Sequence, residues 1–298
     1  MHFYKYILIL NLILFVIFYS NLKSDHTDLN SKFIFTFWEP YNEVPGYLHL
    51  CIKTWKKFLP EYKIIILNYS SLPYYLSSRF ISKILCKNMT LKSQADGIRV
   101  ALLHKYGGIW MDMDTIITNS HFLEMFKGVN LAMFGYKKEN TQHIGFIYAS
   151  KNSKILKVWL KYIIKRVSYY RFISFFNKYF HNNYTKYKFQ KLQKWDYLGN
   201  GIIDQILINV SKKDYLRVES DEMHICPESY FIRNGSFVSK YQKFYFSKGD
   251  AEKIFNFSKG IICLHNSWTP NKYKNMTESQ FLQLNLMISQ LLKLLLKI

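Results

Sequence analysis

Residues 93–115, SQADGIRVALLHKYGGIWMDMDT, decide the fold of this chain. Ser93 and Asp96 have the spacing of a capping box, which predicts the start of a helix. Apolar residues then recur at the helical period, at Ala95, Ile98, Ala101 and Leu102. Two glycines follow, and Gly107 can take the left-handed conformation that ends a helix. The apolar segment after them predicts a buried strand, with Asp112 and Asp114 at its carboxyl end.

The flanking segments predict an α/β domain. Residues 32–38 and 62–68 are runs of β-branched and aromatic residues, and residues 46–58 between them have helical periodicity. Strand, helix and strand in this order predict a parallel βαβ unit. Further strands are expected at 129–136, at 144–150 and from 260 to a last residue at His265. Further helices are expected over 153–167, after a glycine-broken turn within 199–209, and in the tail. The tail reads as one helix capped at Thr277, which either packs in the core or lies on a membrane.

The two aspartates predict a metal site. Residues i and i+2 of a strand point to the same side, and two carboxylates there repel each other unless a cation lies between them. Mn²⁺ and Mg²⁺ suit oxygen ligands, and ligands of open α/β sheets sit at the carboxyl ends of strands. Asp96 and Arg99 share a helix face, where the carboxylate can bind hydroxyl groups and the guanidinium can bind phosphate. The alternatives are a capping role for Asp96 and an ordinary ion pair with Arg99.

Composition favours anionic partners. The 298 residues carry 41 Lys and Arg against 20 Asp and Glu, for a net charge of +21. Residues 151–194 hold twelve Lys and Arg and no acidic residue, which is consistent with a solvated surface, an anionic membrane contact or an acceptor groove. Nucleic acid is not expected as a partner, because no RNP, KH or zinc-finger pattern is present. The four cysteines have no zinc-site spacing.

The first 22 residues predict a membrane anchor. Tyr6–Leu22 are uncharged and mostly apolar, and residues 23–31 form a short polar stem. A single-pass anchor is preferred over a cleaved signal or a buried helix. Asn-x-Ser/Thr occurs seven times after this segment, more than chance would give. This favours a domain in the Golgi or secretory lumen, with the cytoplasmic face of a bacterial inner membrane as the alternative.

The stretch 93–115 resembles the signature of DXD-containing glycosyltransferases of family 32 and of the capsular polysaccharide synthesis type. Their pattern is a Ser-Asp-x-x-Arg helix, a Leu-x-x-x-Gly-Gly turn and then aromatic-x-Asp-x-Asp. Residues 35–68, FTFWEPYNEVPGYLHLCIKTWKKFLPEYKIIILN, also resemble the opening of that family. The resemblance covers about residues 33–118. Ala95 and Trp110 depart from the usual Ser and Tyr, but neither change removes a charge or a metal ligand.

The resemblance implies a GT-A type domain over residues 32–298, with a Rossmann-like, mostly parallel sheet flanked by helices. It implies transfer of a hexose from a nucleotide-diphosphate sugar to a glycan or glycolipid acceptor, with retention at the anomeric carbon. The second half matches more loosely, at DQILIN (204–209) and HNSW (265–268).

The resemblance also implies a role for each candidate site residue. The metal ligands would be Asp112, Asp114 and His265, holding Mn²⁺ or Mg²⁺. The donor would be bound by Asp96, Arg99 and Asp112, with Phe37 and Trp38 stacking on its base. Asp204 and Gln205 would lie beside the reacting sugar. The alternatives are a buried structural His265, an ordinary helix residue at Gln205, and core positions for Phe37 and Trp38.

Two other functions stay open from the sequence. One is a metal-dependent phosphotransferase or hydrolase that uses the aspartates. The other is a non-catalytic, membrane-attached protein that binds glycan or lipid.

Overall fold

The computed structural model describes residues 32–298 except 136–140, 181–182, 195, 212–213, 220–236, 256 and 258–259. The predicted anchor (1–22) and stem (23–31) lie outside the described residues, as do Cys226 and the Asn-x-Ser sites at Asn234 and Asn256. In the part that is described, no helix has both the length and the apolar character to cross a membrane. The membrane anchor stays a prediction, and so does the division of the chain into an anchor (1–22), a stem (23–31) and a catalytic domain (32–298).

A six-stranded sheet lies at the centre of the fold, in the order β2-β1-β3-β6-β5-β7. Its strands are β1 (Phe33–Phe37), β2 (Lys63–Leu67), β3 (Gly108–Met111), β5 (Leu131–Gly135), β6 (Gln142–Ala149) and β7 (Leu216–Glu219). β2, β1 and β3 are parallel, β6 is antiparallel to both of its neighbours, and β7 is parallel to β5. Five of these six strands therefore run in one direction, which confirms the predicted α/β class with a mostly parallel sheet.

The first βαβ unit forms as predicted. β1 leads into α2 (Gly46–Phe58), which returns the chain to β2, with Ile34 opposite Ile64 in a parallel register. The βαβ connection is long enough to cover one sheet face with a helix. α2 buries Leu48, Cys51 and Trp55 against that face.

Helix α4 (Leu91–Tyr106) begins earlier than predicted. Its N-cap is Thr90, whose hydroxyl accepts a hydrogen bond from the Ser93 backbone N–H at 3.2 Å. The predicted capping box of Ser93 and Asp96 is therefore wrong: both residues lie within the helix, and Asp96 has no capping role. At the other end Gly107 has φ +70°, and its N–H donates to the Leu103 carbonyl at 2.8 Å, as the glycine pair predicted.

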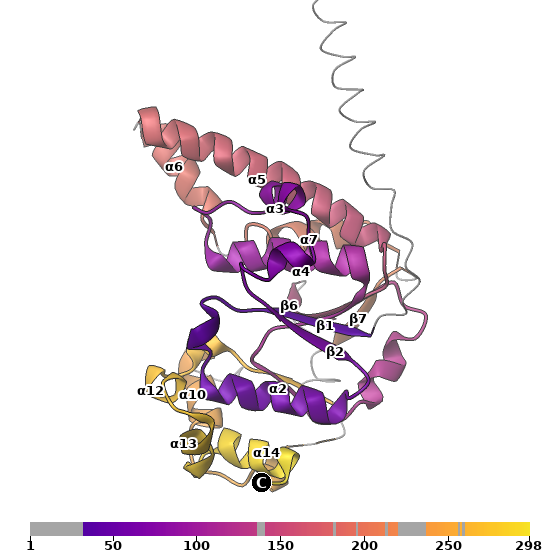
Figure 1. The fold of residues 1–298 in the computed structure, drawn as a ribbon, viewed down its shortest axis with the longest axis vertical. Coiled ribbons are helices and arrows are strands. Elements are labelled where there is room, and N and C mark those ends of the chain that lie inside the picture. The colour runs from indigo at the N-terminus through magenta and orange to yellow at the C-terminus, as the bar shows by residue number, and fades with distance from the viewer. Residues whose placement is uncertain are drawn as a thin grey trace, which may run out of the picture. The chain divides into compact units, whose positions relative to one another are not determined.

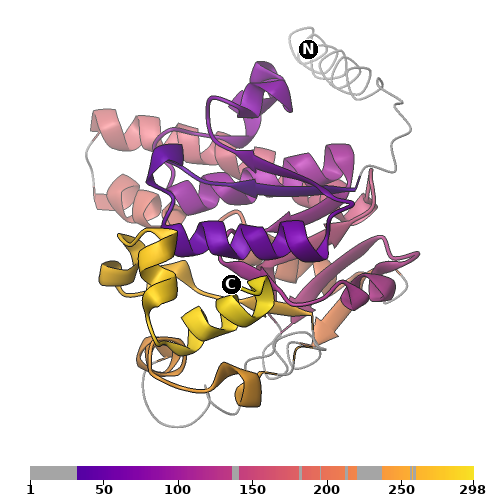
Figure 2. The ribbon, with the colours of Figure 1, turned by 60° about the horizontal axis from the view of Figure 1, so that its bottom comes forward.

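Helices cover both faces of the sheet (Figure 1). On one face α2 packs with α14 (Met287–Leu296) and α13 (Glu278–Gln283), and the C-terminal helices also include α10 (Phe237–Tyr245), α11 (Ala251–Ile254) and α12 (Asn271–Lys274). Figure 2 shows these C-terminal elements, in yellow and orange, beside α2. The other face carries α4, α3 (Ser78–Ile84), α5 (Lys154–Phe180), α6 (Asn183–Leu192) and α7 (Asn200–Leu207). Each face has its own hydrophobic core.

The tail differs from the single helix expected. The capping box at Thr277 and Gln280 is present, but α13 ends at Gln283 and α14 begins at Met287. Ile288, Leu291 and Leu292 of α14 are fully buried in the core beside α2. Of the two environments considered for the tail, the structure shows the core.

Candidate functional site

A two-stranded sheet brings the two halves of the site together. β4 (Thr115–Ile117) pairs antiparallel with β8 (Ile261–Cys263), with Thr115 opposite Cys263. The next residue, Leu264, donates its backbone N–H to the Asp114 carbonyl at 2.9 Å. The Asn266 N–H then donates to Asp114 Oδ2 at 2.6 Å. This pairing places the segment 264–266 against an aspartate about 150 positions earlier in the chain.

Asp112 lies at the end of β3 and is held on three sides. Its N–H donates to the Gly145 carbonyl at 2.7 Å, and its Oδ1 accepts from Trp110 Nε1 at 2.8 Å. Arg99 Nη2 lies 3.5 Å from the same oxygen, yet the Asp112 side chain remains 41% exposed. A Cβ on Gly145 would lie 2.9 Å from Asp112 Oδ2, so the strand approaches the carboxylate more closely than a side chain permits. The carboxylate is thus fixed in orientation and open to solvent.

Arg99 connects the helix to the strand. Its side chain is 5% exposed, and Nη2 lies 3.2 Å from Oδ1 of Asp96, whose side chain is 1% exposed. The guanidinium carbon lies 4.9 Å from the centroid of the Trp110 ring, and Nη1 donates to the Ile144 carbonyl. Asp96, Arg99 and Asp112 therefore form one line of alternating charge. The spacing predicted that Asp96 and Arg99 share a helix face, whereas the contact of Arg99 with Asp112 is seen in the structure.

Asp96 is a buried carboxylate with unused acceptor capacity. Neither of its oxygens accepts a hydrogen bond from the described part of the chain. Burial raises its pKa to about 7, against the opposing effect of the Arg99 charge. A Cβ on Gly199, just before α7, would lie 2.6 Å from Asp96 Oδ2, so the backbone covers this carboxylate closely.

Asp114 has a similarly shifted pKa. Burial and the nearby Asp112 charge raise it to about 7, while the N–H of Asn266 acts in the opposite direction. The neighbouring like charge is the repulsion that the Asp-x-Asp spacing predicted. A divalent cation bound to both carboxylates would relieve it.

The donor set fits Mg²⁺ or Mn²⁺ that is bound together with substrate. No group of three or more His, Cys, Asp and Glu suited to a metal ion occurs within the described ranges. Mg²⁺ is usually held by one or two carboxylates plus substrate phosphates rather than by an all-protein cage. Asp112, oriented and partly exposed, and Asp114 beside it provide two such carboxylates.

His265 lies next to the aspartates, at the start of the short 3-10 turn η5 (Asn266–Trp268). Burial lowers the pKa of its imidazole to about 4, with a further contribution from the charge of Lys92. It is therefore neutral at pH 7, the form that binds metals. Its ring lies 4.0 Å from that of Trp268 and 6.1 Å from that of His143, centroid to centroid. The backbone on either side of His265 binds Asp114, but Asp112, Asp114 and His265 do not form a group of three potential metal ligands in the described part of the chain. The role of His265 as a metal ligand stays a prediction.

Asp204 and Gln205 lie on α7 in different environments. Asp204 Oδ1 accepts the backbone N–H of Gln142 at 3.2 Å, and burial raises its pKa to about 6. Gln142 begins the strand that carries Gly145, so Asp204 is connected to the Asp112 region through β6. Gln205 is exposed on the helix. The predicted catalytic role of both residues stays a prediction.

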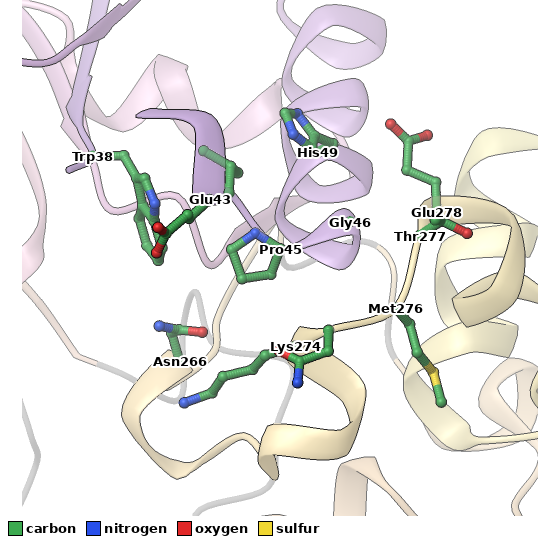
Figure 3. A pocket seen from close by; sticks show the side chains of 12 residues that line it. Trp38, Glu43, Pro45, Gly46, His49, Asn266, Lys274, Met276, Thr277 and Glu278 are labelled. Carbon is green, nitrogen blue, oxygen red and sulfur yellow. The ribbon is translucent and has the colours of Figure 1, made fainter. Parts of the chain in front are cut away.

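Phe37 and Trp38 also differ. Phe37 is 8% exposed, with its ring centroid 5.3 Å from that of Tyr69, which is a core position. Trp38 is partly exposed and lines a pocket of about 790 Å³ together with Glu43, His49, Asn266, Lys274 and Glu278. In Figure 3, Trp38, Glu43 and Asn266 lie on the left of this pocket, and Met276 and Glu278 on the right. Because the Asn266 backbone binds Asp114 while the residue lines the pocket, the pocket adjoins the aspartates.

Several residues of the site were not predicted from the sequence. The buried Tyr47 on α2 donates its hydroxyl to Asn266 Oδ1 at 2.5 Å, which fixes the residue that binds Asp114. Gly145 and His143 on β6 also contribute. No local pattern marks them, because their roles depend on strand pairing and on contacts between residues more than 200 positions apart.

The fold and the site define an α/β protein with an oriented pair of aspartates at the carboxyl end of a parallel strand. The family model for capsular polysaccharide synthesis proteins matches residues 11–259. The chain therefore belongs to the capsular polysaccharide synthesis protein family, which confirms the predicted recognition and supports a glycosyltransferase of polysaccharide biosynthesis. The solved structure of the PaToxG glycosyltransferase is similar, with a TM-score of 0.38, 17% identity, and coverage of 59% of this chain and 68% of that chain. No curated protein matches the chain.

Proposed function

We propose that the protein is a metal-dependent glycosyltransferase that moves a hexose from a nucleotide-diphosphate sugar to a glycan or lipid-linked acceptor. The observation that carries this proposal is the line Asp96–Arg99–Asp112 beside Asp114, at the carboxyl end of β3. Ligands of open α/β sheets bind at that edge. Membership of the capsular polysaccharide synthesis protein family supports glycosyl transfer as the class of reaction.

Asp112 and Asp114 would hold Mn²⁺ or Mg²⁺. When bound, the metal would neutralise charge on the leaving diphosphate as a Lewis acid. Trp110 Nε1 and Arg99 keep Asp112 in one orientation, and the Asn266 N–H does the same for Asp114. Such preorganised carboxylates need little reorganisation when substrate arrives.

Asp96 and Arg99 would bind the donor. The Asp96 oxygens, which accept no hydrogen bond from the described residues, can accept from sugar or ribose hydroxyls. Arg99 lowers the pKa of Asp96, but the effect of burial is larger and the pKa is raised to about 7. A ligand hydroxyl in this dry environment would be selected strongly, because leaving a buried polar group unpaired costs about 1–3 kcal/mol.

The pocket beside Asn266 would receive the acceptor. Trp38 offers an aromatic surface, and Glu43, His49 and Lys274 offer polar groups, the combination that pockets use to orient a ligand. We place Asp204 near the transferred sugar and assign retention to a front-face path, in which the leaving phosphate accepts the acceptor proton. This assignment follows the family resemblance, with Asp204 linked to the site through Gln142.

The test is nucleotide-sugar turnover with and without Mn²⁺, for the wild type and Asp114→Ala. We expect metal-dependent turnover that Asp114→Ala lowers by at least about 100-fold, since about 2.7 kcal/mol of transition-state stabilisation corresponds to that factor. Asp214→Ala, at an exposed aspartate, is the matched control and should retain activity. Turnover that needs no metal, or that survives Asp114→Ala, would refute the proposal.

A further inference from the structure

The helix pair α5–α6 concentrates positive charge. Residues 151–194, which contain both helices, have twelve Lys and Arg and no Asp or Glu. The two helices pack against each other on the side of α4 away from the sheet (Figure 1). The site proposed above does not use this pair.

An apolar stripe along one side of α5 packs the helix against the rest of the domain. Ile155, Trp159, Ile163, Val167, Tyr170 and Ile173 are buried in the core that α5 shares with α3, α4 and α7. Arg166 and Arg171 attach α5 to neighbouring segments, since they donate to the backbone carbonyls of Gly201 and Leu85 respectively. A surface helix held by one apolar stripe is expected to be polar on its other side.

The opposite side of α5 carries exposed aromatic side chains in addition to lysines. Tyr162, Tyr169, Phe172, Phe175 and Tyr179 recur at intervals of three, four or seven residues, and are each between 43% and 59% exposed. We refer to these five side chains, with the exposed Lys154, Lys161, Lys165 and Lys178, as the outer face of α5.

Two rings of the outer face contact each other, and a lysine lies beside one of them. Phe175 and Tyr179 have centroids 4.6 Å apart, and Lys178 Nζ lies 5.4 Å from the Tyr179 ring. On α6, Tyr187 is 52% exposed, with Lys191 Nζ 4.4 Å from its ring. Aromatic surface of this extent is rarely left exposed in a soluble domain unless it meets a partner.

We propose that the outer face of α5 binds the surface of an anionic lipid membrane. Tyr and Phe rings settle at the boundary between headgroups and acyl chains, and Lys side chains on the same face are attracted to anionic headgroups. The opposite charges of the two surfaces favour this partner over a second copy of the chain, because two such faces would repel each other.

The test follows the accessibility of one position on the outer face, in the full-length chain. Ser168 is exposed between Lys165 and Phe172, and Ser279 on α13 is an exposed control position. Ser168→Cys and Ser279→Cys variants are mixed with phosphatidylcholine vesicles, with or without phosphatidylglycerol, and treated with a water-soluble maleimide. Peptide mapping then gives the alkylation rate at each introduced cysteine, separately from the native ones.

We expect the anionic vesicles to slow alkylation at position 168 by at least about tenfold and to leave position 279 unchanged, since each basic residue near an anionic surface contributes about 1 kcal/mol. Adding Lys161→Glu and Lys165→Glu should abolish the slowing. The control pair Lys56→Glu and Lys297→Glu makes the same change in net charge away from α5 and should leave the slowing intact. Circular dichroism would check that each variant is folded.

Two outcomes would overturn the proposal. One is equal alkylation at position 168 on neutral and anionic vesicles, or slowing that persists in the Lys161→Glu, Lys165→Glu variant. The other concerns soluble polyphosphate. If polyphosphate slows alkylation at position 168 as much as anionic vesicles do, and still does so after Phe172→Ser and Tyr179→Ser, the face binds an anionic polymer rather than a membrane. Because any contribution from residues 1–31 is common to all variants, it does not affect these comparisons.

Discussion

Arg99 determines the electrostatics of the site at the scale of single residues. Its guanidinium lies between Asp96 and Asp112 and packs over Trp110, while Trp110 donates to the same Asp112 oxygen. A lysine could supply the charge but not this fork of donors with a stacked ring. The exposed part of Asp112 is therefore oriented by a helix residue and a strand residue together.

Gly145 is expected to control metal affinity through Asp112. In Gly145→Ala the new Cβ would lie 2.9 Å from Asp112 Oδ2 and 2.6 Å from His143 Cε1, so the carboxylate must move. We expect Mn²⁺ affinity, measured by calorimetry in the presence of a nucleoside diphosphate, to fall about tenfold, which corresponds to about 1.4 kcal/mol. Gly128→Ala controls for backbone strain away from the site, because its Cβ would meet nothing within 4 Å while its φ of +75° disfavours any side chain. Unchanged affinity in Gly145→Ala would remove Asp112 from the metal site.

Asp204 is expected to make folding stability depend on pH. Burial raises its pKa to about 6 from an ordinary value of 3.8, so the folded state keeps this proton where the unfolded state has lost it. The stabilisation from that proton is present below about pH 4 and is lost as pH rises through about 6.

Urea unfolding at several pH values from 4 to 6.5 would measure this effect. Asp204→Asn keeps an acceptor for the Gln142 N–H and should flatten the fall in unfolding free energy with rising pH. Asp214→Asn should leave the wild-type slope unchanged, since Asp214 is exposed. A slope that Asp204→Asn does not alter would contradict the assigned pKa.

At the scale of elements, sequence reasoning succeeded where the information is local. The βαβ unit, the glycine pair after α4 and the strand that ends just before Asp112 follow from hydrophobic periodicity and glycine conformation. It failed at Ser93 because Thr90, three residues earlier, offers an equally good hydroxyl. It failed in the tail because the helix breaks at Leu284–Leu286, where neither a glycine nor a proline marks the end of a helix.

The corrected cap of α4 gives a prediction for the element that carries Asp96 and Arg99. Thr90→Ala should lower the free energy of unfolding by about 1 kcal/mol, because it removes the acceptor for the Ser93 N–H. Thr90→Ser keeps a hydroxyl and should restore most of the loss. Chemical denaturation of the three proteins would compare them, and equal stability of Thr90→Ala and wild type would show that the hydroxyl does not cap the helix.

For the whole molecule, the site could be only half predicted from the sequence. Asp96, Arg99, Asp112 and Asp114 lie within 19 residues, so one motif reveals them. The contact of Asp114 with Asn266 depends instead on the pairing of β4 with β8, and the anchoring of Asn266 depends on Tyr47 in α2. Those relations arise from packing between segments distant in sequence, which periodicity does not encode.

The proposed lumenal location gives the last prediction, which concerns the surface of the whole domain. Asn88, Asn209 and Asn275 begin Asn-x-Ser/Thr sequences and are exposed, whereas Asn68 is engaged by the Ser71 N–H at 2.8 Å. Glycosylation requires an accessible acceptor in a chain that enters the secretory pathway. In a eukaryotic cell, the protein should therefore carry glycans at the three exposed sites and less at Asn68.

Glycosidase treatment followed by electrophoresis and peptide mapping would measure this occupancy. Each of Asn88→Gln, Asn209→Gln and Asn275→Gln should remove one step of the mobility shift, and Asn152→Gln, at an exposed asparagine outside any such sequence, should remove none. No shift in the wild type would contradict the lumenal location. That result would leave the proposed chemistry intact, because the aspartate site does not depend on the compartment.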